Sequence, residues 1–284
     1  MTSGEHEDGD AMGETPVAPM DRESTRTRFS LSIVLPCRNE EANVERVVRA
    51  AAEAGRRVSD DVEIIVVDDG STDGTRFLAE ELAQELNRPG LEVRIVRHEV
   101  GRGYGGAVRG GFAAATKDIV FLTDGDGQFD LNEITKLAPL LREYDIVAGY
   151  RITRRDPPAR RLAGRAWTAL MNALFGLHMR DIDCAFKLLP REMLGRLNLM
   201  SEGALISAEI LARAKRLGYR IGQTGVNHYP RTAGRSTGGS AKVILRALDE
   251  LIGLYGPIRK GMGDRIAEPG ATSSGPTAGH MGSS

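Results

Sequence analysis

Short apolar runs alternate with helix-like segments through the first half of the chain. The runs are rich in Ile and Val, which is typical of strands that are buried in a sheet. They are LSIVLP, VEIIVV, VRIVRH, DIVFLT and DIVAGY, at 31–36, 62–67, 93–98, 118–123 and 145–150. Between them, apolar residues recur at helical spacing over 40–56, 75–86, 104–115 and 131–143. This alternation predicts right-handed strand–helix–strand units, and so an α/β fold with a Rossmann-type, mostly parallel sheet flanked by helices.

The second half of the chain is less regular. It predicts a basic segment, a helix, a polar turn, a second helix, a polar loop and a last amphipathic helix, at 151–161, 163–175, 180–192, 205–217, 228–237 and 241–255. Residues 1–28 contain seven acids and few large apolar residues, and residues 261–284 are rich in Gly, Ser, Thr and Pro. Such compositions favour disordered tails. A single globular domain is therefore expected at 29–260.

Composition and charge narrow the class of protein. The 38 Lys and Arg balance 39 Asp and Glu, which argues against a nucleic-acid partner bound through a broad basic face. Cys37 and Cys184 are too few for a disulfide scaffold and lack the spacing of a zinc site, so a reducing compartment is expected. The acidic start and the lack of a long apolar stretch predict neither a signal peptide nor a transmembrane helix. A cytoplasmic location follows as an expectation.

Polar side chains follow the predicted strands at the sheet edge where ligands of such folds bind. Acids and amides come after the first two strands, in PCRNEE and VDDGSTDGT, and these same residues also favour turns and helix starts. After the fourth strand, DGDGQ places Asp124 and Asp126 one residue apart between glycines. Two such carboxylates can share one hard divalent cation, to which a diphosphate adds further oxygens. A glycine-rich loop with solvated acids is the alternative.

The run GRGYGG at 101–106 matches the dinucleotide-binding pattern GxGxxG. It follows the third strand rather than the first, which disfavours an NAD(P)-dependent Rossmann oxidoreductase, although that alternative stays open. The favoured interpretation is that these glycines and Arg109 lie close to a nucleotide diphosphate.

The motifs PCRNEE, VDDGSTDGT, GRGYGGAVRGG and DGDGQ, in this order, resemble glycosyltransferase family 2 with its GT-A fold. The second half is most similar to polyprenyl-phosphate glycosyltransferases of the dolichol-phosphate mannose synthase type, and the resemblance covers about 32–255. It implies a nucleotide-sugar half at 29–130 and an acceptor half at 131–260. It also implies metal-dependent, inverting transfer of a sugar from a nucleotide-diphosphate sugar to a polyprenyl phosphate.

The resemblance assigns roles residue by residue. The donor nucleotide is expected at Pro36, Asn39, Glu40, Asp69, Gly103, Arg109 and Asp124. Mg²⁺ or Mn²⁺ is expected at Asp124, Asp126 and Gln128. Lys187 takes the place of an arginine, so the positive charge is kept without the bidentate fork. Arg231 matches the arginine of a mobile loop, and Glu209 matches a glutamate of the preceding helix, although Ser207 stands where the synthases carry glutamine.

An anionic lipid phosphate requires cations to hold it. The basic residues of the acceptor half supply them: Arg151, Arg160, Arg161, Arg165 and Lys187. A solvated face whose arginines pair with acids is the alternative. Asp181 and Asp183 orient these cations, or one of them is the base for a hydroxyl acceptor. The predicted catalytic residues are Asp126, Lys187, Arg161 and Asp183, with Arg151, Asp181, Glu209 and Arg231 at the acceptor and its loop.

Two other functions remain open at this point. One is a soluble glycosyltransferase that acts on a hydroxyl of a small molecule or glycan, and the other is an inactive nucleotide-sugar-binding module. The helix at 241–255 carries Ile244, Leu248, Leu251, Ile252 and Tyr255 at helical spacing, with cations nearby. This pattern is typical both of peripheral contact with the cytoplasmic membrane face and of packing on the protein's own core or on a partner subunit.

Overall fold

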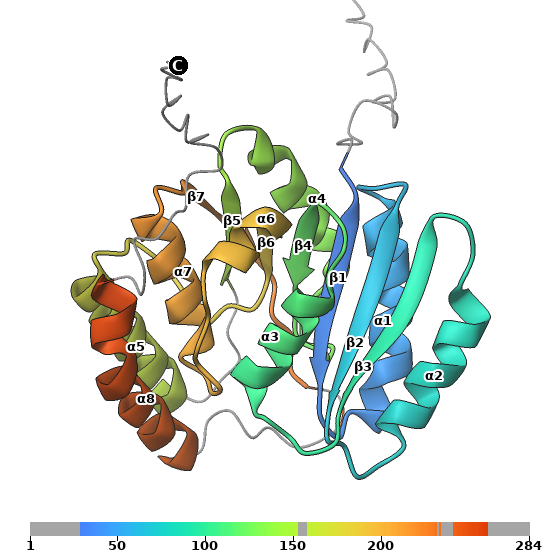
Figure 1. Cartoon of the computed structure of the whole chain (residues 1–284), viewed down its shortest axis with the longest axis horizontal. Helices are drawn as coiled ribbons and strands as arrows, with labels where there is room; N and C mark the ends of the chain where they lie inside the picture. The colour runs from blue at the N-terminus through green and yellow to red at the C-terminus, as the bar shows by residue number, and fades with distance from the viewer. Residues whose placement is uncertain (1–28, 153–157, 232, 234–240, 261–284) are drawn as a thin grey trace, which may run out of the picture.

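A single seven-stranded sheet runs through the computed structural model, which describes residues 29–152, 158–231, 233 and 241–260. The strand order is β3-β2-β1-β4-β6-β5-β7 (Figure 1). The strands are β1 Leu31–Cys37, β2 Val62–Asp69, β3 Leu91–His98, β4 Ile119–Leu122, β5 Ile146–Arg151, β6 Lys187–Pro190 and β7 Ile221–Val226. Only β6 runs against its neighbours β4 and β5 within this described sheet. The prediction of a mostly parallel sheet is therefore confirmed, while the tails predicted at 1–28 and 261–284 lie outside the described residues.

Helices cover both faces of the sheet, as Figure 1 shows. The longer ones are α1 Glu41–Arg56, α2 Thr75–Leu86, α3 Tyr104–Ala114, α5 Pro158–Phe175, α7 Ile206–Arg216 and α8 Ala241–Lys260, and α6 Arg191–Arg196 is short. Apolar side chains of α1 and α2 form one core against the sheet, and those of α3, α5, α6, α7 and α8 form a second core on the other face. The carboxyl ends of the parallel strands thus open at one edge of a three-layer structure.

Three local predictions were wrong or incomplete. The helix expected at 131–143 is broken into η1 Leu131–Glu133, α4 Ile134–Leu137 and η2 Ala138–Arg142. The end of α4 follows from Pro139, which has no N–H to continue the helix. The polar turn expected at 180–192 contains the strand β6, buried between β4 and β5. The edge strand β7 was not predicted, since its sequence IGQTGV has few apolar residues.

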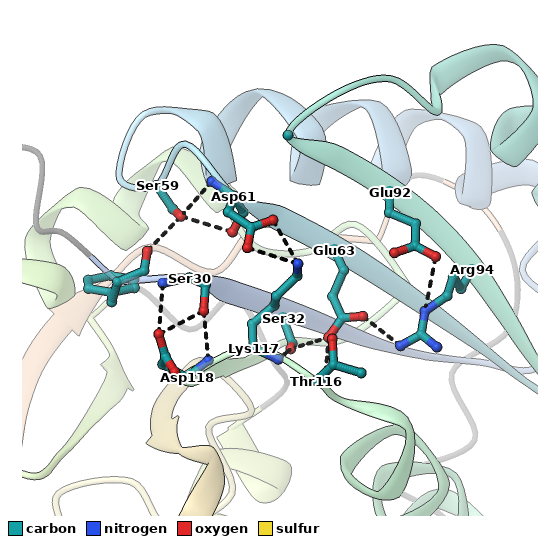
Figure 2. Close-up of polar contacts among 12 residues, drawn as sticks. Ser30, Ser32, Ser59, Asp61, Glu63, Glu92, Arg94, Thr116, Lys117 and Asp118 are labelled. Atoms are coloured by element: carbon teal, nitrogen blue, oxygen red, sulfur yellow. Dashed lines mark hydrogen bonds and ion pairs between the residues drawn. The ribbon is translucent and has the colours of Figure 1, made fainter.

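A polar network ties the amino ends of the strands together (Figure 2). The Glu63 carboxylate of β2 is fully buried and accepts hydrogen bonds from Ser32 Oγ at 2.5 Å, Thr116 N at 2.6 Å and Arg94 Nη2 at 2.5 Å. These bonds outweigh the effect of burial and hold the pKa of Glu63 below its ordinary value. Three donors thus satisfy the buried Glu63 carboxylate, and the network supports the sheet at the end opposite to the strands' carboxyl termini.

Candidate active site

The loops after β1 and β2 are joined by hydrogen bonds. Asn39 has a left-handed backbone with φ 56°, and its side-chain oxygen accepts from Thr72 N at 2.8 Å. Its own N–H donates to Ser71 Oγ at 3.0 Å. Glu40 N donates to Thr75 Oγ1 at 2.8 Å, so the backbone of Glu40 is also held by the loop after β2. Asn39 is thus a link between two strand ends, and its contact with a donor nucleotide stays a prediction.

Asp69, at the end of β2, holds the loop that precedes α3. Its carboxylate accepts from Arg102 N at 2.8 Å, from Gly103 N at 2.9 Å and from His98 Nδ1 at 2.8 Å if that nitrogen carries the proton. Sequence reasoning did not find His98, although it closes β3 next to Asp69 in the parallel register. These contacts fix the loop at the sheet edge. To bind the donor nucleotide as predicted, the Asp69 carboxylate would have to accept a further hydrogen bond beside these three.

The glycines of GRGYGG lie against another backbone segment. Gly103 has φ 85°, and a Cβ there would meet Glu202 O at 2.7 Å. A Cβ on Gly105 would meet Ser201 O at 2.5 Å, while Gly105 N donates to Glu202 O at 2.8 Å. Close packing on 201–203 is therefore a sufficient reason for these glycines, and their contact with a diphosphate stays a prediction.

The DGDGQ loop brings two carboxylates to the carboxyl end of β4. Asp124 Oδ1 accepts from Tyr104 Oη at 3.0 Å, and Asp126 Oδ1 accepts from Gln128 N at 3.0 Å. Gly127 takes φ 70°, a conformation that favours glycine. A Cβ on Gly125 would meet Pro36 O at 2.8 Å, so Pro36 borders this loop through its backbone. Tyr104 is therefore a further site residue. It was not predicted, because the GRGYGG motif was interpreted through its glycines.

Arg231 reaches across the site to two acids that the sequence predicted. Its guanidinium donates to Glu40 Oε1 at 3.0 Å and to Asp126 Oδ2 at 2.9 Å. The segment before it is paired with the DGDGQ loop, because Tyr229 N donates to Gln128 O at 2.7 Å and Gln128 Nε2 donates to Tyr229 O at 2.8 Å. The structure thus brings together Glu40, Asp126, Gln128 and Arg231, although the Gln128 amide is already used.

The electrostatics of Asp124 and Asp126 fit a cation site. Burial, and then the charge of Asp126, raise the pKa of Asp124 above its ordinary value. Burial also raises the pKa of Glu40. Asp126 already binds a cation, the Arg231 guanidinium. Within the described residues, no three His, Cys, Asp or Glu side chains converge on one point. Two carboxylates match the way Mg²⁺ is usually held, with substrate phosphates supplying further oxygens.

In the second half of the chain, Arg151 is paired with Asp181. Arg151 Nε and Nη2 donate to the two oxygens of Asp181 at 2.6 and 2.7 Å, and Arg151 N donates to the same carboxylate at 3.3 Å. The pair closes the end of β5 against the segment that precedes β6. The predicted use of Arg151 to hold an acceptor phosphate therefore competes with a bidentate ion pair.

Lys187, the first residue of β6, is fully buried. Its Nζ donates to the backbone oxygens of Ile182, at 3.3 Å, and of Cys184. Burial lowers its pKa, and the nearby acids Asp181, Asp183 and Asp124 oppose this effect. The Lys187 amine is thus held inside the protein by backbone oxygens, and its direct contact with an acceptor stays a prediction.

Asp183 differs from its neighbour Asp181. Its side chain is half-buried, and its Oδ1 accepts from the indole Nε1 of Trp167 at 3.2 Å. Burial raises the pKa of Asp183 to about 6, while the charge of Arg151 opposes the rise. Trp167 was not predicted as a site residue, although it is the sole tryptophan of the chain.

Other predicted residues lie apart from these carboxylates. Arg161, like Arg160 and Arg165, is exposed on α5. Arg109 donates to Met200 O at 3.2 Å. Glu209 is fully buried on α7, where it accepts from Met200 N, Ser201 N and Arg213 Nε at 2.8 to 3.0 Å. Glu209 therefore has a structural role, since its hydrogen bonds hold the 200–203 segment against which the start of α3 packs.

The helix α8 shows two apolar faces rather than one stripe. Ala247, Leu251 and Ile258 are buried in the second core. Leu245, Leu248 and Ile252 are 66%, 37% and 81% exposed. In the parts of the chain that the structure describes, no helix combines the length and the apolar character needed to cross a membrane. The helix therefore belongs to the core and still leaves an apolar surface uncovered.

Comparison with known proteins identifies the family of the chain. The sequence pattern of "Glycosyl transferase family 2" matches residues 32–197. Dodecaprenyl-phosphate galacturonate synthase of Rhizobium johnstonii is 31% identical over 227 residues, which are 78% of this chain and 66% of that protein. Undecaprenyl-phosphate 4-deoxy-4-formamido-L-arabinose transferase of an Enterobacter species is 30% identical over 58% of this chain and 50% of that protein. The chain thus spans less than two thirds of the length of these relatives.

Solved structures agree in fold. Glucosyl-3-phosphoglycerate synthase of Mycobacterium tuberculosis, crystallised with Mn²⁺, UDP and glucosyl-3-phosphoglycerate, superposes with a TM-score of 0.61. The match covers 90% of this chain and 88% of that one at 22% identity, a level that speaks for the fold alone. The match to the family pattern, rather than this structural likeness, argues against the oxidoreductase alternative. The chain belongs to glycosyl transferase family 2 and has the GT-A fold.

Proposed function

We propose that the chain transfers a sugar, with inversion, from a nucleotide-diphosphate sugar to a polyprenyl phosphate. The observation that carries the proposal is the pair of carboxylates after β4, Asp124 and Asp126, of which Asp126 already holds a cationic side chain. Two relatives named for polyprenyl-phosphate substrates support the acceptor class. The proposed donor half is 29–130 and the proposed acceptor half is 131–260.

A divalent cation, Mg²⁺ or Mn²⁺, would be held by Asp124 and Asp126, with the Gln128 side chain close by. When bound, it stabilises the negative charge that builds up on the departing diphosphate. Tyr104 orients Asp124 through its hydroxyl, and Arg231 lies where it can contact the same phosphates once it leaves Asp126. The residues that link β1, β2 and the loop before α3 shape the proposed nucleotide site: Pro36, Asn39, Glu40, Asp69 and Gly103.

The acceptor half supports contact with a membrane surface. Exposed Leu162 and Leu170 of α5 lie on the helix that also carries Arg160, Arg161 and Arg165. Figure 1 shows α5 next to α8, and the ring centroids of Phe175 and Tyr255 are 5.8 Å apart. Apolar side chains beside cations favour an anionic lipid surface. We place the protein peripherally on the cytoplasmic membrane face.

A hydroxyl acceptor is the second candidate, and Asp183 favours it. A half-buried carboxylate with a raised pKa is suited to take a proton from an alcohol. A polyprenyl phosphate dianion needs no such base. The two candidates share the donor half and differ in the group that attacks the sugar.

Incubation with labelled UDP- and GDP-sugars, with and without polyprenyl phosphate, tests the proposal. Label should enter the organic phase with one donor, and EDTA should abolish the transfer. Undiminished transfer after chelation would contradict the role of Asp124 and Asp126, and label that stays in the aqueous phase on an added alcohol would favour the second candidate.

A further inference from the structure

The helix α3 begins without a side-chain cap. Its N-cap residue is Gly103, which has no side chain to accept from the first N–H groups of the helix. The backbone oxygen of Glu202 accepts from them instead, because Gly105 N and Gly106 N donate to it at 2.8 and 3.3 Å. The start of α3 therefore depends on the position of a backbone segment that is distant in the sequence.

The first residue of α3 carries this dependence to the carboxylates after β4. Tyr104 Oη donates to Asp124 Oδ1 at 3.0 Å. The preceding residue, Gly103, donates from its N–H to Asp69 at 2.9 Å, so the same turn also touches the end of β2. A shift of the Glu202 backbone would therefore move Tyr104, and with it the hydrogen bond that orients the Asp124 carboxylate.

Two carboxylates from different helices hold the segment 200–203. Glu209 of α7 accepts from the first two N–H groups of this segment. Glu250 of α8 lies against the next two residues, where a Cβ on Gly203 would meet Glu250 Oε2 at 2.8 Å. Burial raises the pKa of Glu250, and the charge of Arg246 and the N–H groups of residues 202 and 203 oppose the rise. Those N–H groups therefore face the carboxylate, whose side chain is only 15% exposed.

We infer that Glu250 is a positioning residue for the proposed metal site, because it holds the backbone of residues 202 and 203 that caps α3 and so fixes Tyr104 against Asp124. The inference rests on the proposed sugar transfer and adds to it a residue of α8 that keeps a metal ligand oriented. Glu250 acts through other residues and is not itself catalytic. Hydrogen bonds that orient a metal ligand raise the affinity of the site, so loss of Glu250 should weaken cation binding.

Hydrogen exchange of the full chain tests the first link without any ligand. In Glu250→Ala, the amides of residues 102–108 should exchange at least about threefold faster than in wild type, because their acceptor is no longer fixed. Gly203→Ala should have the same effect, since its Cβ would displace the Glu250 carboxylate. Asp249→Ala is the matched control, because it removes the same charge from an exposed neighbour on α8. Exchange in Glu250→Ala and Gly203→Ala that equals exchange in Asp249→Ala would overturn the inference.

Titration with Mn²⁺ alone tests the link to the proposed metal site. The binding to compare is the part that is lost in Asp126→Ala. Glu250→Ala should weaken this binding about fivefold, the effect of about one hydrogen bond. Glu250→Gln keeps an oxygen toward the N–H groups, so it should stay within about twofold of wild type, as should Asp249→Ala. Unchanged affinity in Glu250→Ala would overturn the inference, and an equal loss in Asp249→Ala would assign the effect to the charge of the helix instead.

Combination with Tyr104→Phe separates positioning from a general loosening of the fold. If Glu250 acts through Tyr104, the double variant should bind Mn²⁺ as weakly as Tyr104→Phe alone, about fivefold below wild type rather than about 25-fold. Additive losses would overturn the inference. A wild-type chain without any Mn²⁺ binding that depends on Asp126 would contradict the proposed metal site, whereas Asp126-dependent binding that is indifferent to Glu250 would overturn the inference alone.

Discussion

Glu63→Gln should destabilise the fold while leaving the chemistry of the site intact. The buried carboxylate of Glu63 accepts from Ser32, Thr116 and Arg94 at the amino ends of the strands (Figure 2). An amide oxygen can keep the bonds from Ser32 and Thr116, but its NH₂ group would face the Arg94 guanidinium, donor against donor. A hydrogen bond to a charged group contributes about 1.5–3 kcal/mol, and an unsatisfied buried donor adds about 1–3 kcal/mol.

Arg94 is 36% exposed, so water compensates part of this loss. We therefore expect the free energy of unfolding to fall by about 3 kcal/mol, which lowers Tm by about 9 °C in a domain of this size. Thermal and urea unfolding at pH 7 measure the change. Glu92→Gln is the matched control, because it removes an exposed partner of the same arginine at 3.6 Å and should cost under about 0.5 kcal/mol.

The stability that the Glu63 carboxylate provides should depend on pH. The pKa of Glu63 is lower in the folded chain than its ordinary value of 4.5, so its ionised form stabilises the fold above that pH. The difference between wild type and Glu63→Gln should stay constant from pH 7 to about 5 and shrink as the pH falls through 4.5. Equal stability of the two proteins at pH 7, or a difference that persists unchanged at pH 3.5, would refute this reasoning.

Three further predictions concern the site and the proposed membrane contact. Asp126→Ala should lower kcat at least about a hundredfold, because it removes a proposed metal ligand, while Tm stays within about 2 °C; full activity would contradict the metal assignment. Lys187→Ala should lower kcat/KM for the acceptor about tenfold or more and change donor affinity less than about twofold. The reason is that Lys187 contacts the segment before β6 rather than the β1 and β2 ends. Isothermal titration with the donor nucleotide measures donor affinity, and a parallel loss of that affinity would place Lys187 at the nucleotide instead. The double variant Leu245→Glu, Ile252→Glu should leave Tm unchanged, because both side chains are exposed, and should abolish co-sedimentation with anionic vesicles. Retained sedimentation would contradict membrane contact through α8. Removing the whole helix would also disturb the core, because Leu251 belongs to it.

The sequence predicts the sheet well where burial controls composition. The runs around Ile33, Ile64 and Val93 are apolar because parallel strands are covered on both faces, and these strands lie where they were expected. β6 was missed for the opposite reason. It is only four residues long and begins with Lys187, whose amine is satisfied by backbone oxygens that no local pattern reveals.

The candidate site was predictable where its residues are close in sequence. DGDGQ supplies its two carboxylates within three residues, so their proximity follows from the chain itself. The contact between Arg231 and Asp126 joins residues 105 positions apart; the family resemblance singled out Arg231 as a loop residue but did not predict this contact. The partners of Gly103 and Glu209 were not predictable, because both depend on where the 200–203 segment lies in the folded chain.

A matched pair of lipids decides whether the sugar goes to the phosphate of the acceptor. The full chain, with the nucleotide sugar that it uses and Mg²⁺ or Mn²⁺, is incubated with a polyprenyl phosphate or with the polyprenol of equal chain length. The extracted lipids are then analysed by mass spectrometry. We predict that the phosphate gains one sugar residue and that the alcohol does not. A glycosylated polyprenol beside unmodified polyprenyl phosphate would contradict the proposed acceptor.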